Sequence, residues 1–127
     1  MGDDRTAVRT LVRELVELYN ARDVDGLIAL YHPNAEYWSP LGDWQRGVDH
    51  IRAHLEELHR TLPDEKMEIV ALMADDETAV VEFMSTGMTP AGNPYRIEFT
   101  EVIEIRDGRI ERVRVYLDPE EVAAITG

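Results

Sequence analysis

Hydrophobic residues in the first sixty positions follow a helical period. In three stretches apolar side chains recur three and four residues apart, which predicts amphipathic helices with one buried face. The predicted helices cover residues 8–19, 23–30 and 48–62. Between the last two we expect a turn at 32–34, because Pro33 disfavours helix in its predecessor, a short strand at 35–39, and a loop at 41–47.

From residue 67 onward the apolar positions alternate with period two, which is typical of strands with one buried face. The predicted strands cover 67–73, 79–88, 95–106 and 109–117. Asp107 and Gly108 separate the last two, and Asp-Gly is among the strongest short hairpin signals. A final helix is predicted from Pro119.

This order of elements predicts an α+β fold, because a group of helices is followed by a meander of strands. We expect a curved antiparallel sheet wrapped by the three N-terminal helices, forming a cone with an internal cavity. Residues 1–127 are expected to form a single domain, since the chain carries no linker, repeat or low-complexity tract.

Composition and charge narrow the possible partners. The net charge of −13 argues against nucleic acid and anionic membrane surfaces, which require clusters of Lys and Arg. The absence of cysteine excludes disulfides, thiolate nucleophiles and Cys-ligated metals. No secretory signal or bilayer-long apolar run is present, so a cytoplasmic location is expected. We expect no cofactor and no metal.

Glu101 departs from the strand pattern. On the predicted strand 95–106 it shares its face with Phe99 and Ile103, so it points toward the expected core. A buried carboxylate is rarely kept without hydrogen bonds or a function, and an inward acid on an apolar wall resembles a general acid/base site. The alternatives are a structural pair with a buried Arg, Tyr or amide, and an outward turn at a bulge.

Two other polar positions have simpler explanations. Asp118 precedes Pro119 and Glu120, which is the pattern of a helix N-cap, so a structural role is favoured over catalysis. His50 and His54 lie four residues apart on one helix, but a third ligand is missing and a zinc site is not predicted. His54 flanks the apolar stripe and is the better candidate for the rim of a pocket.

Several local strings resemble the nuclear-transport-factor-2-like superfamily, in its SnoaL-like polyketide cyclase and ketosteroid-isomerase-like branch. The matching features span nearly the whole chain and are Tyr-Asn-Ala-Arg-Asp-Val-Asp-Gly-Leu at 19–27, Tyr-His-Pro-Asn-Ala-Glu-Tyr at 31–37, Gly47 before a helix, and Arg-Asp-Gly-Arg-Ile at 106–110, running on to Tyr-Leu-Asp-Pro at 116–119. The resemblance implies the cone-shaped fold, but this superfamily holds enzymes and binding proteins, so fold does not determine function.

The resemblance transfers catalytic residues only in part. Where a ketosteroid isomerase has its general-base Asp, its Tyr donor and its protonated acid, this chain has Ser39, Leu15 and Glu101. Steroid isomerisation by that mechanism is therefore not expected. Limonene-type epoxide hydrolases have an Asp in the last strand, where this chain has Val113 and Val115. SnoaL-like cyclases use a pocket acid, a role open to Glu101 or Asp118.

We therefore predict a cofactor-independent acid/base enzyme, an isomerase, cyclase or related lyase or hydrolase, acting on a small apolar carbonyl-bearing molecule. The alternative is a non-catalytic binder or dimeric accessory domain. The predicted catalytic residues are Glu101, Ser39, His54 and Tyr19, and the predicted ligand-binding residues are Leu15, Tyr37, Trp44, Phe83, Phe99, Val113 and Val115. A homodimer through the outward sheet face, which carries Val80, Met84, Val102 and Tyr116, is also expected.

Overall fold

The computed structural model describes residues 4–126 and consists of four helices and six strands. In chain order these are α1 (Asp4–Asn20), α2 (Val24–Ala29), β1 (Tyr31–Trp38), β2 (Gln45–Arg46), α3 (Val48–Thr61), β3 (Lys66–Ala74), β4 (Thr78–Met88), β5 (Pro94–Arg106), β6 (Arg109–Tyr116) and α4 (Pro119–Thr126). The predicted α+β class is confirmed.

The strands form one curved, unclosed sheet in the order β2-β1-β6-β5-β4-β3. All neighbouring strands are antiparallel except β1 and β6, which run parallel. The expectation of a wholly antiparallel sheet is therefore wrong for this pair. Parallel neighbours require a long crossover, and here it is supplied by the chain from β2 to β5.

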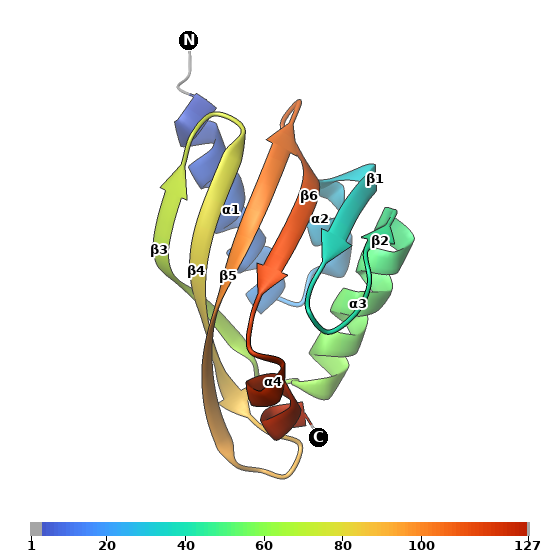
Figure 1. Ribbon diagram of the computed structural model, residues 1–127, viewed down its shortest axis with the longest axis vertical. Coiled ribbons are helices and arrows are strands. Elements are labelled where there is room, and N and C mark those ends of the chain that lie inside the picture. Colours follow the sequence, from blue (N-terminus) through green and yellow to red (C-terminus); the bar gives the residue numbers. More distant parts are fainter. Residues whose placement is uncertain (1–3, 127) are drawn as a thin grey trace.

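Helices α1, α2 and α3 cover one face of the sheet, and α4 lies near one end of it (Figure 1). The apolar stripes of α1 and α3 are buried, with Val12 and Ile51 almost fully so. Their opposite faces are polar and exposed, as expected for amphipathic helices on a sheet. No helix within residues 4–126 is both long and apolar enough to cross a bilayer.

Two segments between the helices differ from the prediction. Residues 32–34 were expected to turn, but they lie within β1, where the pairing with β6 shifts register between Tyr31 and Glu36. Such an irregularity accommodates Pro33, which cannot donate a ladder hydrogen bond. The expected loop at 41–47 contains β2, whose two residues pair with Glu36 and Tyr37.

The local turn and cap signals behave as their chemistry requires. Asp107 and Gly108 both have positive φ, 52° and 76°, as a tight hairpin between twisted strands needs. The Asp118 carboxylate accepts a 2.9 Å hydrogen bond from the Glu120 N–H at the start of α4. Asp118 is therefore accounted for as a helix cap.

The inward face of the sheet is filled at one end and hollow at the other. Ile103 and Val113 are cross-strand neighbours and are almost fully buried in the core. Closer to the start of β5, Ile97 and Phe99 are only partly buried and line a cavity. Glu101, between these two regions, lies where the packed core ends.

Gly87 allows β4 to pass close to the turn between α3 and β3. A Cβ at this position would lie 3.1 Å from Tyr95 Cε1 and 3.2 Å from both Asp64 O and Glu65 Cα. We expect Gly87→Ala to lower the free energy of unfolding by about 2 kcal/mol, because two of these neighbours are backbone atoms that cannot easily move.

Gly42→Ala is the matched control, since no atom lies within 4 Å of its added Cβ. Urea unfolding of both variants should show a change below about 0.5 kcal/mol for Gly42→Ala. Equal stability of the two variants would contradict the close approach at Gly87.

Candidate functional site

A cavity of about 120 Å³ lies between the hollow end of the sheet and the helices. Its wall is mostly aliphatic and aromatic, with contributions from α1, α2, α3, α4 and strands β1, β3, β5 and β6. The polar side chains in the wall are Tyr19, Tyr31, Tyr37, Ser39, His54, Glu65, Glu101 and Thr126. A few polar groups in an apolar concave wall are the usual composition of a small-molecule site.

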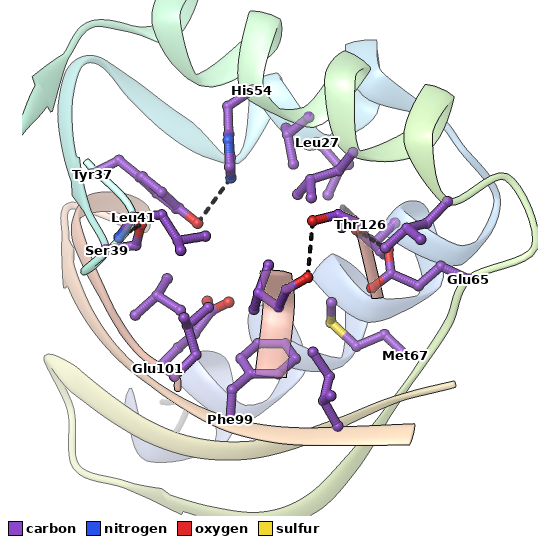
Figure 2. Close-up of a pocket in the computed structure, with 18 of the residues that line it drawn as sticks. Leu27, Tyr37, Ser39, Leu41, His54, Glu65, Met67, Phe99, Glu101 and Thr126 are labelled. Atoms are coloured by element: carbon purple, nitrogen blue, oxygen red, sulfur yellow. Dashed lines mark hydrogen bonds between the residues drawn. The ribbon is translucent and has the colours of Figure 1, made fainter. Parts of the chain in front are cut away.

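The carboxyl group of Glu101 points into this cavity (Figure 2). Its cross-strand neighbours, Val81 and Val115, are both buried and apolar. Within residues 4–126 the carboxyl group makes no hydrogen bond or ion pair to another side chain or to the backbone. Burial raises the pKa of Glu101 to about 7, because the ionised form loses its hydration without gaining a partner.

Two phenols lie near Glu101 and belong to β1. Burial first, and the charge of Glu101 second, raise the pKa of both Tyr31 and Tyr37 above the ordinary phenol range. Both groups therefore remain protonated at neutral pH and can act only as neutral hydrogen-bonding groups.

Tyr37 and His54 face each other across the cavity wall, and Figure 2 shows both polar tips directed toward the same space as Glu101. The distance from His54 Nε2 to the Tyr37 hydroxyl is 3.1 Å, and the two rings are 4.9 Å apart. Burial lowers the pKa of His54, which favours neutral imidazole near pH 7. The pair can thus share a proton without carrying charge.

Ser39 occupies the end of the β1 wall. Its side chain is buried, and its Oγ accepts a 3.2 Å hydrogen bond from the Leu41 N–H. That bond uses an acceptor position of the hydroxyl and leaves its proton available. Leu41 itself also lines the cavity although it is 51% exposed, so this segment lies at the rim.

Tyr19 is in the cavity wall, but its hydroxyl is already engaged. It donates a short hydrogen bond to Glu65 Oε1. Burial, together with the adjacent Glu65 charge, raises the pKa of Tyr19. Because its proton is directed at Glu65, Tyr19 is poorly placed to polarise a ligand as the sequence suggested.

Glu65 itself was missed by the sequence analysis. It lies in the polar turn between α3 and β3, outside any alternating pattern, yet its side chain is buried and lines the cavity. Its carboxyl group contacts Tyr19 and Ser85, which lie 46 and 20 positions away in the sequence. No local signal in the sequence marks it.

The predicted apolar lining is only partly found. Leu15, Phe99 and Val115 lie in the wall. Phe83 and Val113 point inward as predicted, but they are buried in the packed core and do not line the cavity. Strand alternation identifies the inward face but not how deep each residue lies.

Trp44 is also absent from the cavity wall. It is 47% exposed and lies 6.4 Å from the ring of Trp38, with the Arg112 guanidinium 5.6 Å from its own ring. Pairing of β2 with β1 folds the loop back along the sheet edge and brings Trp44 to the outer face, where Arg112 lies. The prediction that Trp44 binds ligand is therefore not supported by its position.

The two helical histidines do not converge on a metal. His54 faces the cavity, whereas His50 is exposed. Across the part of the chain that the structure describes, no three His, Asp or Glu side chains are grouped to hold a metal ion.

The sequence of this chain is similar to a known protein family and to individual known proteins. A family model described as "SnoaL-like domain" matches residues 12–113. The uncharacterized protein YesE of Bacillus subtilis (strain 168) is 30% identical, in an alignment covering 94% of this chain and 86% of YesE.

Two further proteins are similar over nearly the whole chain. The epoxide hydrolase LasB of Streptomyces lasalocidi is 28% identical over 96% of this chain, which spans about half, 51%, of the length of LasB. A nuclear-transport-factor-2-like protein of unknown function from Burkholderia pseudomallei superposes with a TM-score of 0.86 at 20% identity, covering 99% of this chain and 98% of that one. This likeness confirms the predicted fold.

The lone carboxyl group predicts an unusual pH dependence of stability. The folded-state pKa of Glu101, about 7, lies above the unfolded value of about 4.3. The protonated carboxyl group therefore makes its full contribution to the free energy of unfolding below about pH 4.3. This contribution is lost as the pH rises through 7. Between pH 4.5 and pH 8 the free energy of unfolding of wild type should fall relative to that of Glu101→Gln by about 3 kcal/mol.

Urea unfolding of both proteins at these two pH values measures the difference. A structural ion pair at Glu101 predicts the opposite, a mutant that is less stable than wild type at both pH values, because it would leave a buried cation without its partner.

Proposed function

Because this chain belongs to the SnoaL-like domain family, we propose that its cavity is the active site of a cofactor-independent acid/base enzyme. The substrate would be a small, largely apolar molecule carrying a carbonyl group. The observation that supports this most directly is Glu101, a cavity-facing carboxyl group that has no hydrogen-bonding partner within residues 4–126 and a pKa of about 7. Catalytic acids and bases work best when their pKa lies near the working pH.

In the proposed reaction the ionised form of Glu101 accepts a proton from the carbon next to the carbonyl. The electron pair of that C–H bond becomes the C=C bond of an enolate, and the carbonyl oxygen takes the negative charge. If the substrate also carries a C=C bond next to that carbon, the enolate extends over it, and return of the proton to the far carbon of that bond gives an isomer. Attack of the enolate carbon on a second carbonyl instead forms a C–C bond, with the proton passing to the new alkoxide, which is a cyclisation.

We assign stabilisation of the enolate oxygen to Tyr37, supported by His54. Tyr37 is a protonated phenol close to Glu101, and its hydroxyl lies 3.1 Å from His54 Nε2. A donor fixed in a water-poor site stabilises developing negative charge more than it would in water. The Ser39 hydroxyl is a second donor on the same wall.

The size and charge of the cavity limit the substrate. An engineered apolar cavity of about 150 Å³ binds benzene, so a volume of about 120 Å³ suits a molecule of about one six-membered ring. Within the described chain no Lys or Arg side chain lines the cavity, while two carboxyl groups do. A neutral substrate is therefore favoured over an anionic one.

Exchange of α-protons tests this function on a simple ketone that matches the cavity in size. Wild-type protein should speed the incorporation of deuterium from D2O into cyclohexanone, measured by mass spectrometry. The rate should rise with pH through about 7, because the ionised form of Glu101 is the base. Glu101→Gln should lower the rate about a hundredfold or more, since it cannot accept the proton.

Leu58→Met, a volume-conserving change in the cavity wall, is the control for altered packing and should keep most of the exchange rate. Binding of cyclohexanone with no exchange at any pH would contradict proton abstraction from carbon by Glu101.

The similarity to LasB favours a second candidate, ring opening of an epoxide. There protonated Glu101 would donate its proton to the epoxide oxygen as the C–O bond breaks, and water attacking the carbon would return a proton to Glu101. This mechanism requires the protonated form, so hydrolysis of cyclohexene oxide would fall as the pH rises through about 7. The opposite slopes of the two pH profiles separate the candidates.

We also propose that the protein forms a homodimer through the outer face of the sheet. No helix of the described chain covers that face (Figure 1). It carries an aromatic cluster of Trp38, Trp44 and Tyr116, with Tyr116 49% exposed. Val80 and Val102 form a cross-strand pair on the same face. Exposed aromatic and aliphatic side chains gathered on one face are typical of an interaction surface.

Light scattering at micromolar concentration should give the dimer mass for wild type. Tyr116→Asp should give a monomer, because it would bury an unpaired charge in the proposed interface. Ala53→Asp, on the exposed side of α3, is the control and should remain dimeric. A monomeric wild type would contradict the proposal.

A further inference from the structure

Glu65 is a second carboxyl group in the cavity wall, and the proposed proton transfer does not require it. Figure 2 shows it on the far side of the cavity from Glu101 and Tyr37. The two acids therefore mark opposite ends of one small apolar space.

Hydroxyl groups hold the Glu65 carboxylate in place. The Tyr19 hydroxyl donates to Oε1, and the Ser85 hydroxyl donates to Oε2 over 2.5 Å. Ser85 Oγ lies 3.1 Å from the Tyr95 hydroxyl, which can donate to it in turn. Because these hydroxyls supply the protons, Glu65 is an acceptor at both oxygens.

These bonds leave part of the acceptor capacity of Glu65 unused. A carboxylate offers about four lone-pair positions, and the two hydroxyls occupy one on each oxygen. The nearby Arg22 guanidinium bonds to the backbone carbonyls of Asn20, Pro63 and Glu65 rather than to the carboxylate. In the described chain the cavity-facing side of this group therefore has no protein donor.

A role confined to structure would need only the bonds to Tyr19 and Ser85. Ser85 is buried and does not line the cavity, whereas Glu65 and Tyr19 do. A fixed acceptor that faces an apolar space and keeps lone-pair positions open is suited to a ligand that carries a donor.

We propose that Glu65 binds a hydroxyl group of the substrate, at the end opposite the carbonyl that meets Glu101 and Tyr37. The ligand class is thus a neutral hydroxy-carbonyl compound of about one ring, with its two polar groups on opposite sides. This inference rests on the proposed function for the carbonyl end, while the hydroxyl end is set by Glu65 alone.

Binding of two probes of nearly equal size tests the proposal. 4-Hydroxycyclohexanone and 4-methylcyclohexanone differ only in a hydroxyl or methyl group at the ring position opposite the carbonyl. Wild-type protein should bind the hydroxyl probe about tenfold more tightly in an NMR titration, because a hydrogen bond to a charged acceptor contributes that much. An apolar wall without a working acceptor would favour the methyl probe instead.

Two variants assign the preference to Glu65. Glu65→Gln should reduce the hydroxyl preference at least threefold, since a neutral amide accepts a weaker hydrogen bond. Glu68→Gln makes the same change at an exposed position of β3 outside the cavity wall, so it is the matched control and should retain the preference. A full hydroxyl preference in Glu65→Gln would overturn the proposal.

The wild-type measurement alone also decides the matter if Glu65→Gln does not fold, because absence of any hydroxyl preference overturns the proposal. The outcome is independent of turnover. Deuterium exchange without a hydroxyl preference would contradict the role of Glu65 in binding and still support proton transfer by Glu101. A hydroxyl preference without exchange would support Glu65 as a binding residue and contradict proton abstraction by Glu101.

Discussion

The incomplete filling of the inward sheet face is the constraint on which the rest of this structure depends. Strand alternation requires Glu101 to point inward together with Phe99 and Ile103. Beside Ile103 the core is closed, but beside Phe99 it is open. A carboxyl group in the closed part would need a buried partner, whereas at the edge of the cavity it can meet a ligand.

Much of the fold follows from local patterns in the sequence. The features that could not be predicted depend on contacts between segments that are distant in the chain. Helical and strand periods, the Asp107-Gly108 hairpin and the Asp118 cap are properties of neighbouring residues, and each is found. The parallel pairing of β1 with β6 joins segments about 75 residues apart, as Glu36 and Arg112 illustrate. No local pattern specifies such a pair, because its stability comes from tertiary packing.

The same distinction applies to the site. Alternation gives the face on which Glu101, Phe83 and Val113 lie, but only the packed structure shows that the last two are deeper than the cavity. Trp44 was misplaced because a two-residue strand, too short to leave a periodic signal, folds its loop back along the sheet edge. Glu65 had no signal at all, since its partners are distant in the chain.

The two acids in the cavity are treated differently by the fold, and this difference gives each a separate chemistry. Glu65 is fixed by hydroxyl donors, whereas Glu101 has none in the described chain and only desolvation acts on it. Hydrogen bonds hold a carboxylate in one orientation, while desolvation without them brings its protonation into the neutral range. In the binding mode and reaction proposed above, one small cavity would orient a ligand at the Glu65 end and move a proton at the Glu101 end.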